Sequence, residues 1–209
     1  MKLGMTVYGG VDLLDVAGPY EMFSWVDKSK GLEALILSEK GKPVTSGNGV
    51  TFEAHASLDE TPALDVLWVP GGLPENLAKM MWHPDSPYFT YLKQVAAHAR
   101  WVCSVCEGAL LLARAGLLDG HKATTHWAFE RCLREFPKIQ VESGHPRFVV
   151  SGNRLTGGGI SSGLDEALKL IELLFDEATA ISVQQTTQYF PRPSVNGNIP
   201  PVPACSIRW

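Results

Sequence analysis

Short apolar runs alternate with segments of helical spacing along most of the chain. Four of these runs predict strands that end in turn residues or polar residues: Leu3–Tyr8, Leu32–Leu37, Ala63–Val69 and Trp101–Val105. Segments with helical spacing lie between and after these runs. One begins at Pro19 and another at Ala109, and the others cover Leu73–Met81, Tyr88–Ala99, Ala128–Phe136, Leu164–Phe175 and Asp176–Gln188. The alternation predicts a doubly wound α/β sandwich around a mostly parallel sheet. We expect one domain, residues 1–190, followed by an extended tail rich in Pro, Asn and Gly, residues 191–209.

A cysteine lies at the sharpest predicted turn from strand to helix. The apolar run Trp101–Val105 leads into Cys106, and Gly108 is followed at once by strong helix formers. Strand, nucleophile and helix in this order are typical of a nucleophile elbow, in which a small residue lets the helix pack close to the turn. Unpaired N–H groups at the helix N-terminus favour a thiolate, which predicts that Cys106 is a nucleophile. A buried, unreactive cysteine fits the same local pattern.

Further polar candidates follow the other predicted strands. Asp15 is expected in a loop before a helix, either as a cap or as a carboxylate turned into a cleft. Gly71 and Gly72 either form a plain tight turn or let backbone N–H groups approach a negatively charged oxygen. His126 stands where a strand gives way to a helix, and it is either a structural residue or one that faces the thiol. Loops after parallel strands meet at one sheet edge, so we expect these residues to lie together.

The composition excludes several classes of function. The 209 residues carry a net charge of −4, so no basic field attracts nucleic acid or anionic lipid. No apolar run reaches the length of a membrane span, and acidic residues interrupt the apolar N-terminus, so we expect a cytoplasmic protein. The glycine run 157–163 lacks the spacing of a dinucleotide loop and the lysine of a phosphate loop, which disfavours nucleotide binding.

The four cysteines do not indicate a secreted disulfide framework in a chain of this length. Cys103 and Cys106 form a Cys-x-x-Cys pair, but no second pair accompanies them. On a strand the two side chains would face opposite sides of the sheet. Metal binding and dithiol chemistry are therefore disfavoured, and we predict no metal.

Several motifs together resemble the ThiJ/PfpI superfamily and, within it, the bacterial isocyanide (isonitrile) hydratases. The matching segments are Leu14–Pro19, Val69–Gly72, Ser104–Gly108, Ala113–Gly120, Ala123–Ala128 and Leu155–Ile160. The similarity continues to Tyr189 and covers nearly the whole chain. It implies a flavodoxin-like fold, a homodimer with sites near the subunit interface, no cofactor and a reactive cysteine on the elbow.

The resemblance also implies roles for individual residues. Cys106 is expected to be the nucleophile, and Asp15 the carboxylate hydrogen-bonded to it. Backbone groups that bind substrate or an oxyanion are expected at Gly72, Glu107, Gly158 and Ile160, with His126 as a further candidate. Glu107 departs from the family pattern, because the peptidase-like branch commonly has His there and the hydratases a small hydroxyl residue. This departure disfavours a Cys–His protease dyad and leaves the substrate open.

The resulting hypothesis is cysteine-dependent hydration of an isocyanide to the N-formamide. Cys106 would attack the terminal carbon and Asp15 would deliver the proton, after which water would expel the sulfur. One alternative is a glyoxalase or deglycase in which the same thiol attacks an α-oxoaldehyde. Another is a thiol sensor or regulatory domain without catalytic activity.

Overall fold

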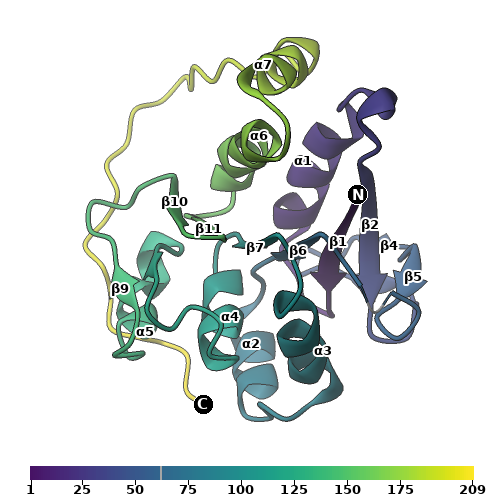
Figure 1. Cartoon of the computed structure of the whole chain (residues 1–209). Helices are drawn as coiled ribbons and strands as arrows, with labels where there is room; N and C mark the ends of the chain where they lie inside the picture. Colours follow the sequence, from purple (N-terminus) through teal and green to yellow (C-terminus); the bar gives the residue numbers. More distant parts are fainter. Residues whose placement is uncertain (62) are drawn as a thin grey trace.

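A seven-stranded sheet runs through the middle of the molecule (Figure 1). The computed structural model describes residues 1–61 and 63–209. The strand order is β10-β11-β7-β6-β1-β2-β5, and all neighbours are parallel except β10 with β11. The strands are β1 (Lys2–Val7), β2 (Glu33–Ser38), β5 (Ala56–Ser57), β6 (Val66–Val69), β7 (Trp101–Ser104), β10 (Phe148–Ser151) and β11 (Arg154–Gly157). The predicted mostly parallel sheet is confirmed.

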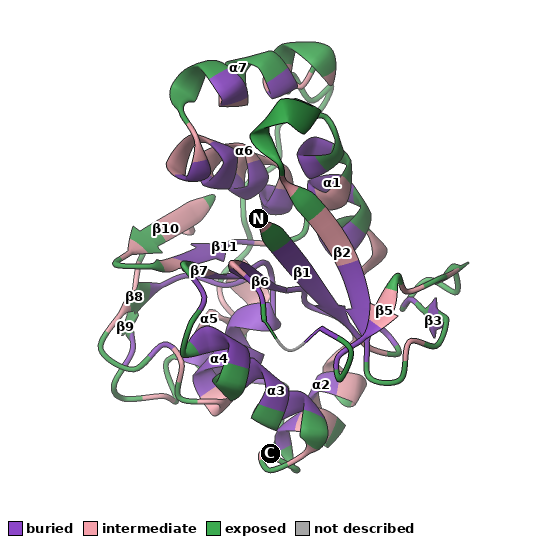
Figure 2. Cartoon of the chain, turned by 45° about the vertical axis from the view of Figure 1, so that its right-hand side comes forward, coloured by how far each residue is buried: buried purple, intermediate pink, exposed green. Residues whose placement is uncertain are grey.

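Helices cover both faces of this sheet (Figure 1). α1, α6 and α7 lie on one face, and α2, α3 and α4 lie on the other. Their bounds are α1 (Leu13–Ser24), α2 (Pro74–Met81), α3 (Pro87–Ala96), α4 (Gly108–Arg114), α6 (Ser162–Leu174) and α7 (Glu177–Thr186). Because both faces are covered, β6 is buried at every position, as its unbroken apolar run predicts (Figure 2). The arrangement is the expected doubly wound, flavodoxin-like fold.

Helix α1 begins earlier than the sequence predicts. It starts at Leu13, so Pro19 lies inside it and Asp15 lies in its first turn, not in a loop. A proline within a helix leaves the carbonyl four residues earlier without its N–H donor. Here that carbonyl belongs to Asp15, and it accepts a hydrogen bond from the indole Nε1 of Trp68 at 3.2 Å. The tertiary contact with β6 thus replaces the missing backbone bond, and the helix continues through Pro19.

The remaining elements are short and lie outside the main sheet. Two small sheets pair β3 (Val44–Thr45) with β4 (Thr51–Phe52) and β8 (Lys122–Ala123) with β9 (Gln140–Val141), and a 3₁₀ turn covers η1 (Lys28–Lys30). The helix predicted over Ala128–Phe136 is instead a 3₁₀ turn, η2 (Trp127–Phe129), followed by α5 (Glu130–Leu133). Phe129 has a φ of −112°, outside the helical region, and this separates the two turns.

A disulfide bond fastens the end of the chain to the body of the molecule. It joins Cys132 in α5 to Cys205 across a sequence separation of 73 residues, whereas Cys103 and Cys106 are free. The sequence argument that the cysteines form no disulfide framework overlooked this pair, because residues so far apart meet only in the fold. In Figure 1 the tail, drawn in yellow, descends from α7 past β9 and α5. Within the described residues no helix is long and apolar enough to cross a membrane.

Candidate active site

Cys106 occupies the sharp turn between β7 and α4. Its φ of 57° lies in the left-handed region, which costs a non-glycine residue about 1–3 kcal/mol and is common at functional sites. Two hydrogen bonds hold the turn: the Cys106 N–H donates to the Gly158 carbonyl at 2.8 Å, and the Thr125 hydroxyl donates to the Cys106 carbonyl at 2.8 Å. A Cβ on Gly108 would stand 2.0 Å from the Val69 carbonyl oxygen. The predicted close packing of the helix under the elbow is therefore observed.

Two aspartates converge on the sulfur of Cys106. One ligand atom each from Asp12, Asp15 and Cys106 lie within 4.8 Å of one another. The Asp12 Oδ2 is 4.0 Å from the Cys106 Sγ. Asp15 is fully buried, and its Oδ2 accepts a hydrogen bond from the Gly71 N–H at 2.9 Å. Its Oδ1 has no hydrogen-bond partner among the described residues, so one oxygen of this carboxyl remains available.

Burial works against ionisation of the Cys106 thiol. Burial first, and then the charges of Asp15 and Glu107, raise the pKa of Cys106 well above its usual range, against a smaller lowering by the Ile160 N–H. The sequence argument from the helix N-terminus favours a thiolate, whereas this burial opposes one. The dipole acts over one turn, whereas the desolvation and the facing acids come from tertiary packing.

Burial raises the pKa values of the acids around the sulfur as well. Burial, with added repulsion from Glu107 and Asp12, raises the pKa of Asp15 well above its usual range, although the Gly71 N–H opposes the rise. Burial raises the pKa of Glu107 to about 7, against hydrogen bonds that favour its ionised form. A neutral carboxylic acid is thus available next to the thiol near neutral pH.

Glu107 occupies the space that the glycine turn leaves open. Its carboxyl is buried, and a Cβ added to Gly71 would stand 2.5 Å from its Oε2. The Gly72 N–H and the N–H of Glu107 itself favour the ionised carboxyl. The backbone donors that the resemblance assigns to substrate binding at Gly72 and Glu107 therefore lie beside the Glu107 side chain.

Two acids of this region were not found by sequence reasoning. Asp12 precedes Asp15 by three residues, a spacing that places both carboxyls on one side of a helix start. Glu166 in α6 is fully buried with neither carboxyl oxygen partnered in the described part of the chain, and burial followed by the Asp15 charge raises its pKa well above its usual range. The signal for Glu166 was an acid on the apolar face of a predicted helix.

A pocket of about 370 Å³ is lined by Gly158, Ile160 and His126, three residues that the sequence predicts for the site. Cys106 and Asp15 do not line it, but the backbones of Gly158 and Ile160 contact Cys106. The Gly158 N–H already donates to the Arg147 carbonyl at 2.9 Å, so Gly158 offers its carbonyl to Cys106 and no free N–H to a ligand. Ile160 is the residue whose N–H favours the thiolate. A larger cavity, about 540 Å³ at the carboxyl ends of β1 and β2, contains none of the predicted site residues.

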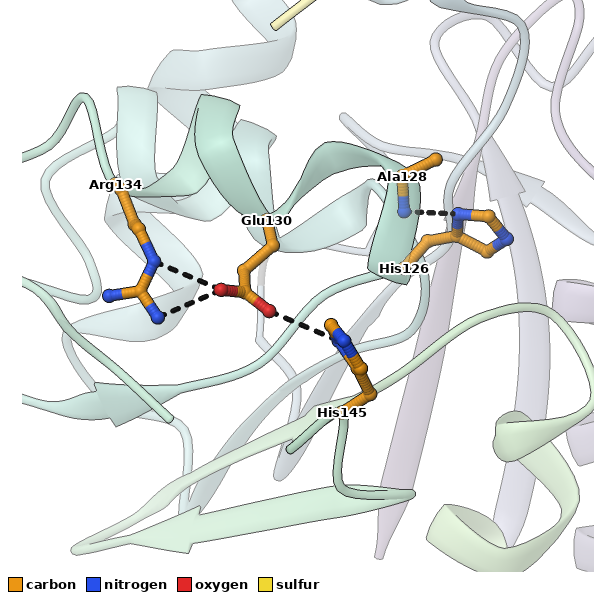
Figure 3. A network of polar contacts seen from close by, with 5 residues as sticks. All are labelled: His126, Ala128, Glu130, Arg134 and His145. Carbon is orange, nitrogen blue, oxygen red and sulfur yellow. Dashed lines mark hydrogen bonds and ion pairs between the residues drawn. The ribbon is translucent and has the colours of Figure 1, made fainter. Parts of the chain in front are cut away.

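His126 lines this pocket and, within the described residues, makes no hydrogen bond to Cys106. Its Nδ1 accepts a hydrogen bond from the Ala128 N–H at 3.2 Å, and burial lowers its pKa (Figure 3). The neutral ring then carries its proton on Nε2. A separate network in the same view joins Glu130 to Arg134 and to His145, another pocket residue. Because His126 lines the pocket and its Nδ1 is already bonded to Ala128, its Nε2 is the ring atom that can contact a ligand there.

Comparison with known proteins places this geometry in a family. A model of the DJ-1/PfpI family matches residues 1–173. The chain belongs to the DJ-1/PfpI family. Among its relatives is the isonitrile hydratase of Pseudomonas putida, 35% identical over 200 residues that cover 96% of this chain and 83% of that protein.

The DJ-1/PfpI family also contains proteins of other kinds. The crystal structure of a ThiJ/PfpI family protein from Pseudomonas syringae has a TM-score of 0.83 and 33% identity, covering 93% of this chain and 77% of that one. The HTH-type transcriptional regulator GbdR of Pseudomonas aeruginosa is 29% identical over 174 residues. That match covers 81% of this chain and only 46% of the regulator. DJ-1/PfpI membership therefore leaves the activity to be argued from the site.

Proposed function

We propose that this chain is a cysteine-dependent enzyme that hydrates an isocyanide to the corresponding N-formamide. The observation that carries the proposal is the buried cluster in which a thiol on a strained turn is surrounded by carboxyls. An isocyanide carbon accepts a nucleophile but offers no leaving group, so it requires a thiol and an acid together. The similarity to isonitrile hydratase over most of both chains supports the same reaction.

In the first step the Cys106 sulfur forms a bond to the terminal carbon of R–N≡C. The thiol transfers its proton to a carboxylate oxygen of the cluster, and a neutral carboxyl delivers a proton to the same carbon. We assign the delivery of the proton to Asp15, because its Oδ1 is unpartnered among the described residues while its Oδ2 is fixed by Gly71. The product of the step is a thioimidate, R–N=CH–S–Cys106.

In the second step water adds to the thioimidate carbon. One water proton passes to the nitrogen, and the hydroxyl oxygen remains on the carbon. The bond between carbon and sulfur then breaks as the hydroxyl loses its proton through the carboxyl cluster to the sulfur, which restores the thiol and releases R–NH–CHO. Ile160 favours the negative sulfur in this step, because its N–H points to it.

The test is a direct assay of the purified protein with p-nitrophenyl isocyanide, following the formamide by absorbance. Cys106→Ala is expected to lose at least about a thousandfold in kcat, as nucleophile removal does in other enzymes. Cys103→Ala is the matched control, because Cys103 is the other free, buried cysteine and lies on β7. Turnover in Cys106→Ala equal to that of the control would contradict the proposal. Product from methylglyoxal with none from the isocyanide would replace it with α-oxoaldehyde chemistry.

A further inference from the structure

The C-terminal tail is held at its two ends and crosses the body between them. At its start, the Tyr189 N–H donates to the Gln184 carbonyl at 3.0 Å, and the Tyr189 hydroxyl donates to the Asp165 carboxylate at 3.3 Å. In the part of the chain that the structure describes, no hydrogen bond involves residues 191–204. We refer to residues 191–204 as the strap.

The far end of the strap has four separate anchors. Cys205 is disulfide-bonded to Cys132 in α5, and the next apolar residue, Ile207, is 1% exposed in the core. The Arg208 carbonyl accepts a hydrogen bond from the Trp82 indole at 3.1 Å. Trp209 stacks on Phe136 with the ring centroids 5.5 Å apart. The strap therefore ends at a fixed point.

Ile199 is the strap residue that reaches the pocket beside Cys106. It lines the same cavity as Gly158 and Ile160, whose backbones contact Cys106. Two prolines follow it directly, and a residue before proline is confined to extended conformations. Only five residues separate it from Cys205, so the disulfide also limits how far Ile199 can move.

The strap borders a second cavity as well. Pro191, Arg192 and Pro193 line a pocket that shares Arg147 and Ser161 with the pocket beside Cys106. The strap therefore borders both of these neighbouring pockets, and Figure 1 shows its course from α7 down past α5. Proline-rich segments are stiff and lose little entropy when held in place, which suits a wall that must keep its position.

We infer that Ile199 sets the size of the R group that can reach Cys106, and that the Cys132–Cys205 disulfide holds it in place. This inference rests on the proposed function for the identity of the substrate, an isocyanide. A slender R group fits between Ile199 and the opposite wall, whereas a bulky one requires the strap to move. Reduction by an external dithiol breaks the S–S bond and forms two S–H groups, as the dithiol closes to its own disulfide. The strap is then fixed only by its noncovalent anchors.

The first test compares kcat/KM for ethyl isocyanide and 2-naphthyl isocyanide in the full chain. In Ile199→Ala the ratio is expected to shift about tenfold toward the naphthyl compound, as for other changes of size in an apolar pocket. Cys205→Ser and dithiol-treated wild type are expected to shift in the same direction. Val195→Ala is the matched control, because Val195 is a more exposed strap residue outside the pocket lining.

The second test measures alkylation of Cys106 by peptide mass spectrometry, with iodoacetamide as the small reagent and N-(1-pyrenyl)maleimide as the bulky one. Ile199→Ala is expected to accelerate labelling by the bulky reagent alone. This result in a protein that turns over no isocyanide would overturn the proposed function and leave the role of the strap intact. Unchanged ratios in Ile199→Ala in both tests, or equal shifts in Val195→Ala, would overturn the inference about Ile199.

Discussion

At the scale of single residues, the site gathers acids around one thiol, and within the described residues no basic side chain forms a hydrogen bond with that thiol. Asp12, Asp15 and Glu107 all face Cys106, and Glu166 adds a further buried carboxyl. Carboxyls this close cannot all ionise, so they share protons, and their titrations are coupled. Such a cluster can donate and accept protons at the same pH, which hydration requires twice in each cycle.

The two aspartates are expected to differ in their effect on turnover. Asp15→Asn should reduce kcat about 10²–10⁴-fold, the usual range for loss of a general acid, because Asp15 is fully buried and fixed by Gly71. Asp12→Asn should lose less than about tenfold, because Asp12 is only partly buried and solvent can replace it. The measurement is kcat with p-nitrophenyl isocyanide. A larger loss in Asp12→Asn would transfer the proton-delivering role to Asp12.

Glu107 is expected to make stability depend on pH. Its pKa rises from 4.5 in the unfolded chain to about 7 in the folded one. Below pH 4.5, Glu107 is protonated in both the folded and the unfolded chain. Between the two values only the unfolded chain releases the proton, so the stability of the wild type relative to Glu107→Gln falls as pH rises, by about 3 kcal/mol in total. Above pH 7 the difference is constant.

Urea unfolding of wild type and Glu107→Gln between pH 4 and pH 9 checks this prediction. The free energy of unfolding of Glu107→Gln should rise relative to that of the wild type as the pH increases from 4.5 to about 7. Above that pH the difference between the two should stay constant. A difference that is independent of pH would show that Glu107 ionises normally in the folded protein.

At the scale of elements, the elbow depends on how closely α4 approaches β6. Gly108 begins α4 directly beneath the end of β6, and the space for its side chain is filled by the backbone of that strand. The close approach brings the helix start beneath Cys106 and imposes the left-handed turn. The strain of the nucleophile therefore comes from the packing of two neighbouring elements.

Gly108→Ala is expected to destabilise the protein by about 1–3 kcal/mol and to reduce turnover. The added methyl group would collide with the Val69 carbonyl, and backbone cannot move aside as a flexible side chain can. Gly9→Ala is the control, since a Cβ at Gly9 meets nothing within 4 Å. Thermal unfolding and the isocyanide assay measure both effects. Equal stability of the two variants would mean that α4 has room to move.

At the scale of the whole molecule, the tail connects distant parts of the fold. Cys205 closes a loop of 73 residues onto α5, and Ile207 and Trp209 extend the core on that side of the sheet. A link over such a distance acts mainly by restricting the unfolded chain.

Reduction of the disulfide is expected to lower the free energy of unfolding by about 2–4 kcal/mol, the typical range for a disulfide bond. Urea unfolding with and without a dithiol measures the loss. Cys132→Ser provides the matched comparison, because it should show the lower stability in both conditions and no further response to the dithiol. An equal free energy of unfolding of the wild type with and without the dithiol would contradict the prediction.

We also expect a homodimer, with an apolar contact beside the pocket. Leu14 and Ile160 both line the pocket and are 43% and 40% exposed, so they place two large apolar side chains together at the surface. Light scattering during gel filtration should give about twice the chain mass of 22.8 kDa. Leu14→Glu should shift the species toward the monomer, whereas Ile181→Glu in the middle of α7 should not. A wild-type mass equal to one chain would contradict the expectation.

The sequence by itself determined the order of the elements, the parallel sheet and the position of the elbow. These follow from local properties: the unbroken apolar run before Pro70, the β-branched run before Cys106 and the need for glycine at position 108. It also predicted that Asp15, Gly72, His126 and the elbow would gather at one edge of the sheet, and Asp15 does lie beside Cys106 while His126 lines the neighbouring pocket. All of these depend on side chains and neighbours close in the sequence, or on the shared direction of parallel strands.

Only the tertiary structure decided the start of α1, the burial of the titratable groups in the site and the course of the tail. Trp68 replaces the hydrogen bond lost at Pro19, burial beside other acids raises the pKa of Cys106, and Cys132 meets Cys205. Each of these results depends on groups that are far apart along the chain. Desolvation and long-range pairing exist only after the elements have packed, so no local pattern could have carried them.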